Sequence, residues 1–444
     1  MNKLVRVPLK LNPYLASFSD LFTRPSYVSF CHVTTTIAVC DKSKTVFNLH
    51  ETMADDNKDK KGRSSYNWFI TNGDWDEDEI AQRKADLFFE ELHLKKDNRI
   101  LLIIDDTYNE KKGKHTEGVG KFFDHSKGFI WGNNIVTSVL QAKGLFIPHK
   151  AKIYVKKEDA GTNFKSKIQI AIKDIIKPLK IPAGTKLMVV FDSWWYSAML
   201  IKSCRDLGYH ITCQIKSNKK VLLNNQDSLS VKAYAKRFDN EDFKEISIKA
   251  RGKRRSYFII EQLVSLDKSS QVRLVISKEN LDAEPRYYIC TDTDLPAKEI
   301  LSIYEDRWDI ETAHREANQK LGFKDYQLRS KKAIERFMQL VFAIWTGILL
   351  VEIESPPLGA KKKTLGEMVD QVRSESIVDL MIYVMDCFNL PIPDEGGLLY
   401  KLKAIGLKVG KQSYLNTPMS QSIMIPDNVK ADRSFRAVLQ LLIN

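Results

Sequence analysis

The stretch RILLIIDD (residues 99–106) decides the fold, because five consecutive apolar residues are followed by two adjacent carboxylates. A continuous apolar run of this length is typical of a strand buried on both faces of a sheet. A second run, KLMVVFD (186–192), has the same form and also ends in an acid. The carboxyl end of a strand is where a sheet flanked by helices usually presents catalytic groups. Both acidic positions are therefore candidate site residues.

The segments around these two strands predict a mixed sheet covered by helices. Alternating and apolar patterns indicate strands over 134–141 and 144–155, and an amphipathic helix over 164–180 that ends near Pro178. A helix and a further strand follow the second acid. This order defines an α/β class with a mixed sheet. Nearer the N-terminus, the β-branched residues of 28–50 predict short strands.

Composition favours a basic protein that contacts nucleic acid. The 444 residues include 69 Lys and Arg against 56 Asp and Glu, and 43% are apolar, which supports real cores and excludes a disordered chain. Segment 211–255 alone has 12 Lys and Arg against 5 Asp and Glu, and RGKRRS (251–256) is its densest point. Phosphate neutralisation is the usual role of such an excess.

Several other classes are excluded or disfavoured. The apolar run Met338–Val351 is too short to span a bilayer, and the N-terminus has no apolar signal core, so we expect a cytoplasmic protein without a membrane partner. The six cysteines have no C-x-x-C spacing, which disfavours a zinc ribbon. The sequence GVGK (118–121) lacks the spacing of a phosphate-binding loop, so no nucleotide cofactor is expected.

A third acid, Glu311, lies in a segment with helical periodicity, PAKEILSIYEDRWDIETAHREANQKLG (296–322). Tyr304, Arg307 and Glu311 are spaced by three and four residues, which places them on one face of a single helix.

The chain resembles a known family at this point. The stretch YYICTDTDLPAKEILSIYEDRWDIETAHREANQKLGF (287–323) is similar to the C-terminal signature of bacterial insertion-sequence DDE transposases, in the insertion-sequence-4 superfamily and its 701-type branch. That signature is Tyr, two residues, Arg, three residues, Glu, six residues, Lys. Tyr304, Arg307 and Glu311 match it, whereas position 318 is Asn and the nearest lysine is Lys320.

Two further blocks carry the same resemblance. IDDTYNEKKGKHTEGVG (104–120) resembles the block around the family's first acid, and VVFDSWW (189–195) resembles its second-acid strand. The resemblance implies an RNase H-like core, interrupted by a β-rich insertion between the second Asp and the Glu, with a smaller N-terminal domain and a helical C-terminal region. The expected domains are 1–95 (DNA-binding), 96–213 and 290–354 (catalytic core), 214–289 (insertion) and 355–444 (C-terminal).

The resemblance also implies a metal site. Asp105, Asp192 and Glu311 would bind two Mg²⁺ ions, which Mn²⁺ can replace, and hard cations of this kind prefer oxygen ligands. The adjacent Asp106 is the alternative first ligand, although the family's Asp-x-Thr pattern selects Asp105. Simpler alternatives are that Asp192 forms a turn and that Glu311 pairs with a nearby arginine on the helix face.

The function implied is a DNA transposase that cleaves at the ends of its element and joins the 3′-hydroxyls to target DNA. Its expected partners are double-stranded DNA, namely terminal inverted repeats and target, and a second copy in a homodimer. The alternatives are a metal-dependent nuclease without strand transfer and a non-catalytic DNA-binding protein. The residues expected to contact DNA are Tyr304, Arg307, Lys112, Lys114, Arg251, Lys253, Arg254 and Arg255.

Overall fold

The structure, a computed structural model, describes residues 3–54, 60–124, 127–222, 228–250, 252–267, 271–354 and 363–391. Arg251, one of the predicted DNA contacts, lies outside the described residues. The chain forms two compact units. One unit is built on a large sheet and contains residues 92–114 and 118–314, and the other is helical and takes its described residues from 1–91, 115–117 and Arg315 onwards.

The centre of the sheet unit is strand β1 (Arg99–Glu110). It pairs antiparallel with β3 (Gly128–Ala142) on one side and parallel with β5 (Lys186–Phe191) on the other. Beyond these strands, β4 (Leu145–Tyr154) is antiparallel to β3, and β6 (His210–Ile215) is parallel to β5. The order β4-β3-β1-β5-β6 is that of an RNase H-like sheet, so the predicted fold class is confirmed.

Helices connect the parallel strands, as the α/β pattern predicts. Helix α7 (Lys167–Ile170) begins at a capping box on Ser166 and continues as a π turn (Ala171–Ile176). It leads into β5, and α8 (Ala198–Asp206) connects β5 to β6. A short helix, α6 (Lys157–Ala160), comes before α7.

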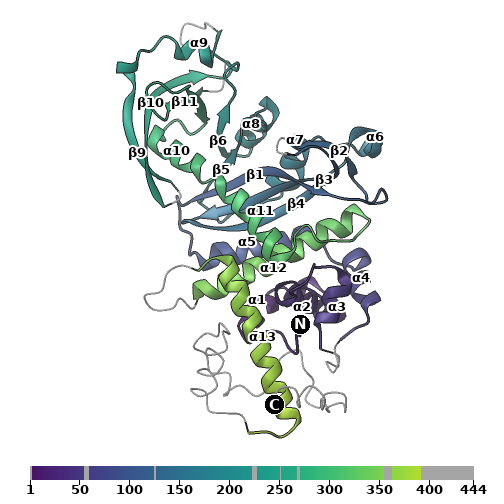
Figure 1. Ribbon diagram of the computed structural model, residues 1–444. Helices are drawn as coiled ribbons and strands as arrows, with labels where there is room; N and C mark the ends of the chain where they lie inside the picture. The colour runs from purple at the N-terminus through teal and green to yellow at the C-terminus, as the bar shows by residue number, and fades with distance from the viewer. Residues whose placement is uncertain are drawn as a thin grey trace. The chain divides into compact units, whose positions relative to one another are not determined.

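The residues after β6 extend the same sheet. β12 (Arg286–Cys290) is antiparallel to β6 and β11 (Gln271–Lys278) is antiparallel to β12, so the sheet has twelve strands among the described residues. Figure 1 shows β9 and β10 toward one end of this sheet and β2 (Val119–Asp124) at the other. The remaining elements of this part are β7 (Lys220–Leu222), β8 (Ser228–Ser230), α9 (Val231–Ala235), β9 (Lys244–Ala250) and β10 (Lys253–Ser265).

In the helical unit, α12 (Lys331–Glu354) packs against α2, α4, α5 and α13. Among the described residues it is the one helix long and apolar enough to cross a membrane, but 78% of its most apolar window is buried, as in the core helix of a globular unit. The helical C-terminal region is represented by α13 (Leu365–Cys387). The other helices are α1 (Asn12–Ala16), α2 (Arg24–Val39), α3 (Val46–Thr52), α4 (Arg63–Asn72) and α5 (Glu77–Glu91).

The strands predicted over 28–50 are wrong, because this segment is covered by α2 and α3. The β-branched residues of α2 from Val33 to Val39 are buried, and two of their hydroxyls are satisfied within the helix. Thr34 donates to the carbonyl of Phe30, and Thr36 Oγ1 donates to the carbonyl of His32 at 2.7 Å. Burial inside a helical unit therefore outweighs the β propensity of these residues.

The single helix predicted over 296–322 is two helices, α10 (Ala297–Glu305) and α11 (Trp308–Leu321). The break falls at Asp306 and Arg307. Asp306 Oδ2 accepts a hydrogen bond from Gln141 Nε2 at 3.2 Å, which ties the break to strand β3. Tyr304 therefore lies in the last turn of α10, whereas Arg307 lies in the two-residue break between the helices.

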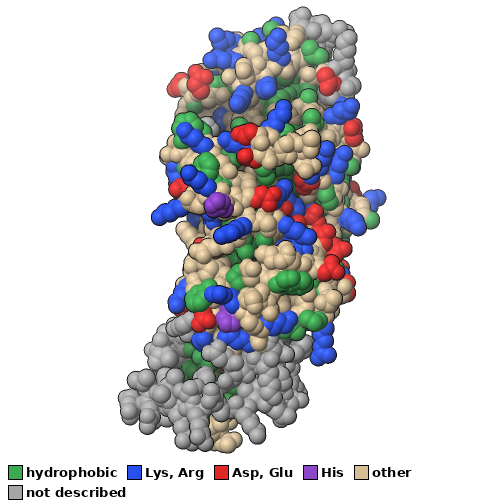
Figure 2. Space-filling view, turned by 90° about the vertical axis from the view of Figure 1, so that its right-hand side faces the viewer, with side chains coloured by type: hydrophobic (Ala, Val, Ile, Leu, Met, Phe, Trp, Pro, Cys, Tyr) green, Lys and Arg blue, Asp and Glu red, His purple; other side chains and the backbone are tan. Residues whose placement is uncertain are grey.

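Positive and negative side chains are mixed on the face of the molecule that Figure 2 shows. Figure 2 shows one face of the molecule, on which Lys and Arg side chains are scattered among acidic ones and do not form one continuous patch. The positive net charge of the chain therefore does not by itself locate a DNA-binding surface.

Candidate active site

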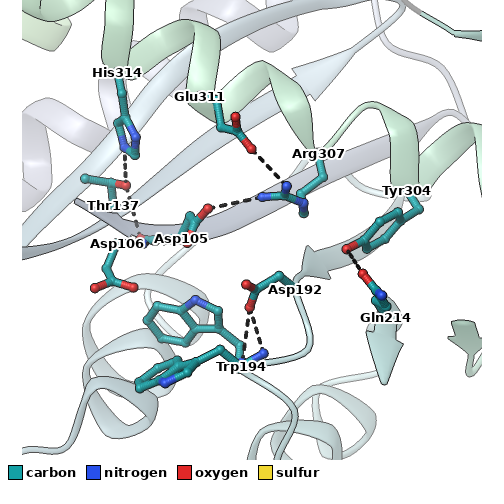
Figure 3. A network of polar contacts seen from close by, with 11 residues as sticks. Asp105, Asp106, Thr137, Asp192, Trp194, Gln214, Tyr304, Arg307, Glu311 and His314 are labelled. Carbon is teal, nitrogen blue, oxygen red and sulfur yellow. Dashed lines mark hydrogen bonds and ion pairs between the residues drawn. The ribbon is translucent and has the colours of Figure 1, made fainter. Parts of the chain in front are cut away.

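The three predicted acids come from three elements of the fold (Figure 3). β1 and β5 are parallel, with Ile103 opposite Val190. Asp105 and Asp192 each lie two residues beyond this pair, so they are found at the same edge of the sheet. Glu311 is in the first turn of α11.

One guanidinium connects two of these acids. Arg307 Nη1 is 3.1 Å from Asp105 Oδ2, and Arg307 Nη2 is 2.9 Å from Glu311 Oε1. The Arg307 side chain is only 17% exposed, so these charge-assisted bonds are shielded from water. The simpler alternative for Glu311, an ion pair with a neighbouring arginine, is thus present, but the same arginine also binds an acid 202 residues away in sequence.

The carboxyl of Asp105 has an unusual proton affinity. Burial and, to a smaller extent, the negative charge of Asp192 raise its pKa to about 7, although Arg307 opposes the rise. Asp192 thus acts electrostatically on Asp105, and Arg307 links Asp105 to Glu311, so we refer to these three acids as the carboxylate cluster. Perturbed carboxyls of this kind gather at functional sites.

Asp192 also shapes the chain that follows it. Its Oδ1 accepts hydrogen bonds from the backbone N–H of Trp194 at 2.9 Å and of Trp195 at 3.4 Å. This is the turn-forming role that was the simpler alternative for Asp192. Of the two tryptophans, Trp195 is buried, whereas Trp194 is 49% exposed.

Asp106 has different partners from its neighbour. Its Oδ2 is 2.7 Å from Lys167 Nζ and accepts a hydrogen bond from Asn134 Nδ2 at 2.6 Å. The Lys167 ammonium also lies 4.7 Å from the ring centre of Trp194. Asp105 and Asp106, which the sequence predicts at the end of a strand, lie within β1 because its pairing with β3 continues to Glu110. Both carboxylates are partnered, one by α7 and one by the region of α11.

Tyr304 stands beside the acids rather than among them. Its hydroxyl donates to Gln214 Oε1 at 3.0 Å, and its ring contacts that of Tyr288 edge-on with 4.8 Å between centres. Burial raises the pKa of Tyr304 above the ordinary range, so the phenol keeps its proton.

The structure adds a residue that sequence reasoning missed. His314 Nε2 is 2.7 Å from Thr137 Oγ1, and Thr137 Oγ1 donates to the backbone carbonyl of Asp105 at 3.1 Å. His314 follows Glu311 by three residues, and this helical spacing is the signal that could have identified it.

The predicted DNA-contacting cations lie elsewhere in the sheet unit. Lys112 and Lys114 are exposed in the segment after β1. Lys253 and Arg254 are exposed on β10, where Arg254 Nε donates to Ser247 Oγ at 2.9 Å. Arg255 is 3.9 Å from Glu305 on α10.

The donor set fits a hard divalent cation in its chemistry, since three carboxylates supply oxygen ligands and excess negative charge. In the described part of the chain, however, no three His, Cys, Asp or Glu side chains already converge as metal ligands. Arg307 supplies the positive charge between Asp105 and Glu311 in this arrangement. Cation binding would require this guanidinium to move away.

Comparison with known proteins agrees with this geometry. A family model described as "DDE superfamily endonuclease" matches residues 31–238, and one described as "Archaeal putative transposase ISC1217" matches residues 136–351. The first match includes both aspartates, and the second includes Asp192 and Glu311. The chain is 24% identical over 288 residues to "Probable transposase for insertion sequence element IS701" of Microchaete diplosiphon, covering 62% of this chain and 72% of that protein.

An RNase H-like sheet with these family matches defines a protein of the DDE class. Within that class, the chain belongs to the insertion-sequence DDE transposases and is IS701-like. The family acts on DNA and uses divalent metal ions, which agrees with the carboxylate cluster.

Proposed function

We propose that this protein cleaves phosphodiester bonds at the ends of its element and joins the 3′-hydroxyls to target DNA, with Asp105, Asp192 and Glu311 as the metal-binding acids. The observation that carries the proposal is the contact of Asp105 and Glu311 with one guanidinium at 3.1 and 2.9 Å, while Asp192 acts electrostatically on Asp105. Mg²⁺ is the proposed ion, with Mn²⁺ as a substitute.

When bound, a divalent cation would activate the oxygen nucleophile and stabilise the leaving 3′ oxygen. Asp105, Asp192 and Glu311 would hold the cation, and other residues of the chain position these acids. Thr137 fixes the backbone of β1 at Asp105, and the turn at Asp192 fixes the end of β5. Arg307, once released from the acids, is placed to hold a backbone phosphate beside them. Tyr304 is proposed to orient the neighbouring DNA through its hydroxyl.

The proposed DNA path extends beyond the acids. Lys112, Lys114, Lys253, Arg254 and Arg255 are proposed to contact phosphates, and residues 1–95 to help recognise the terminal repeats. The protein would work as a homodimer on paired ends, and in the cytoplasm, where the chromosomal DNA of a bacterium lies.

A plasmid that carries the gene with its natural flanks tests the cleavage step. With Mg²⁺, the wild-type protein should release the element, and Asp192→Asn should bind the flank DNA in gel shifts without cutting it. Asp206→Asn on α8, an exposed acid outside the cluster, is the matched control and should cut normally. Unchanged cutting by Asp192→Asn would refute the proposed site.

A second assay separates transposition from simple nuclease activity. Precut flank ends are incubated with the protein, Mg²⁺ and a supercoiled target plasmid. Joined products support the proposed strand transfer. Cutting in the first assay without joining in the second would replace the proposal with a metal-dependent nuclease.

A further inference from the structure

The antiparallel ribbon formed by β2 and β3 has an exposed aromatic face. Phe123, Phe129 and Trp131 are 50%, 70% and 42% exposed, which is unusual for large aromatic side chains. The register pairs Phe123 with Phe129 and Lys121 with Trp131, so these four side chains share one side of the ribbon. We refer to them as the ribbon face.

The opposite side of the ribbon already holds it to the sheet unit. There, Ile130 is buried, and the ring of Phe122 lies 6.0 Å from Tyr108 and 6.2 Å from Tyr154 between centres. The ribbon face is therefore not needed for this packing. Exposed aromatic clusters without a packing role commonly mark binding surfaces.

Cations lie directly against these rings. Lys121 Nζ is 4.4 Å from the ring centre of Phe129. Trp131 Nε1 donates to the carbonyl of Gly113 at 3.4 Å, which brings the segment of Lys112 and Lys114 to the ribbon face. Glu110, the last residue of β1, is paired with Lys127 at 2.6 Å.

This combination favours nucleic acid over an apolar protein partner. An apolar partner would have to strip water from the Lys121 ammonium, at a substantial cost. Nucleic acid offers both a flat base for the rings and a phosphate for the lysines. Aromatic platforms bordered by cations are typical of surfaces that bind unpaired strands by stacking.

The position of the ribbon connects it to the acids. Strand β1 contains Asp105, and Lys111, the residue directly after this strand, contacts the ribbon because its N–H donates to the carbonyl of Trp131 at 2.9 Å. Six residues of strand span roughly 20 Å. That length corresponds to about six nucleotides of stacked DNA.

We propose that the ribbon face stacks on unpaired bases of the DNA strand that runs from the active site. This inference rests on the proposed function, since it assumes a DNA substrate at the acids. The ribbon face would be a second DNA contact surface. It would bind single-stranded DNA without sequence preference, several nucleotides from the cleaved bond.

Binding of fluorescein-labelled dT₂₀ and of a 20-base-pair duplex, measured by anisotropy in EDTA, tests the proposal. The double variant Phe129→Ala, Trp131→Ala should lose roughly ten- to a hundred-fold in affinity for dT₂₀ and much less for the duplex. Phe129→Trp with Trp131→Phe should bind dT₂₀ like the wild type, because both rings are kept. Leu207→Ala, which removes a 37% exposed apolar side chain directly after α8, is the control and should bind dT₂₀ like the wild type.

Unchanged dT₂₀ binding by the double alanine variant would overturn the proposal, as would equal loss of both DNA forms. A changed oligomeric state in sedimentation with unchanged DNA binding would instead identify a contact between copies, and would also overturn it. Because EDTA prevents cleavage, the result does not depend on catalysis. Failure of the plasmid assay with normal dT₂₀ binding would count against the proposed function alone.

Discussion

Arg307 Nη1 lies 3.1 Å from Asp105 Oδ2, although the two residues are 202 positions apart in the chain. This contact joins α11, which carries the third acid, to the strand that carries the first. It also places a fixed positive charge where the family's chemistry needs a cation. Under the proposed function, Arg307 and a metal ion would therefore compete for the same carboxylates.

The first prediction follows from this competition. Arg307→Ala should bind Mn²⁺ more tightly in the absence of DNA, by about tenfold, because no charged hydrogen bonds have to be broken. Isothermal titration calorimetry measures the change. Cleavage of the flank plasmid should nevertheless fall, since the proposed phosphate contact is lost. Arg315→Ala, an exposed arginine of the same helix, should leave both unchanged, and equal or weaker Mn²⁺ binding by Arg307→Ala would contradict the prediction.

The second prediction concerns the two adjacent acids of β1. Asp105→Asn should abolish cleavage because it removes a proposed ligand. Asp106→Asn should lower cleavage by roughly tenfold, since it weakens only the bonds to Lys167 and Asn134 that support the strand end. Initial cleavage rates at saturating Mg²⁺ compare the two variants. If Asp106→Asn were inactive and Asp105→Asn active, the assignment would be reversed.

Much of the sheet could be predicted from the sequence, but few of the hydrogen bonds and ion pairs of the candidate site could be. The runs 99–106 and 186–192 have only one stable environment, a strand buried on both faces, so their prediction is confirmed. The prediction of strands over 28–50 is wrong because Thr and Val favour strands that expose one face, whereas most of α2 is buried inside the helical unit. The contact of Arg307 with Asp105 depends on the bend at Asp306, which unbroken helical periodicity hides.

The third prediction is a pH dependence of stability at that bend. Burial raises the pKa of Asp306 to about 6, from 3.8 in the unfolded chain. The folded state therefore binds this proton more tightly than the unfolded chain does. The buried charge lowers the stability of the fold by its full amount above pH 6, and this loss is relieved as the pH falls from 6 to 4. At pH 8, Asp306→Asn should increase the free energy of unfolding by up to about 3 kcal/mol and should therefore raise the melting temperature.

At pH 4.5 the gain should be much smaller, because Asp306 is then mostly protonated in the folded state. The asparagine can still accept the hydrogen bond from Gln141, so the comparison isolates the charge. Thermal unfolding followed by circular dichroism at both pH values provides the measurement. A gain of equal size at the two pH values would show that the charge of Asp306 is not its source.

The fourth prediction tests the basic tip of β10. Lys253 and Arg254 are exposed, and each phosphate contact that they make releases counterions when DNA binds. The double variant Lys253→Ala, Arg254→Ala should therefore flatten the plot of log affinity against log salt by about two units, for the flank duplex and for unrelated duplex alike. Lys173→Ala with Lys177→Ala removes one exposed lysine in the π turn and one directly after it, and should leave the slope unchanged. Arg255 serves as an internal comparison, because its pairing with Glu305 in the structure predicts a smaller change for Arg255→Ala than for Arg254→Ala. An unchanged slope in the Lys253 and Arg254 double variant would mean that this strand tip lies away from the bound DNA.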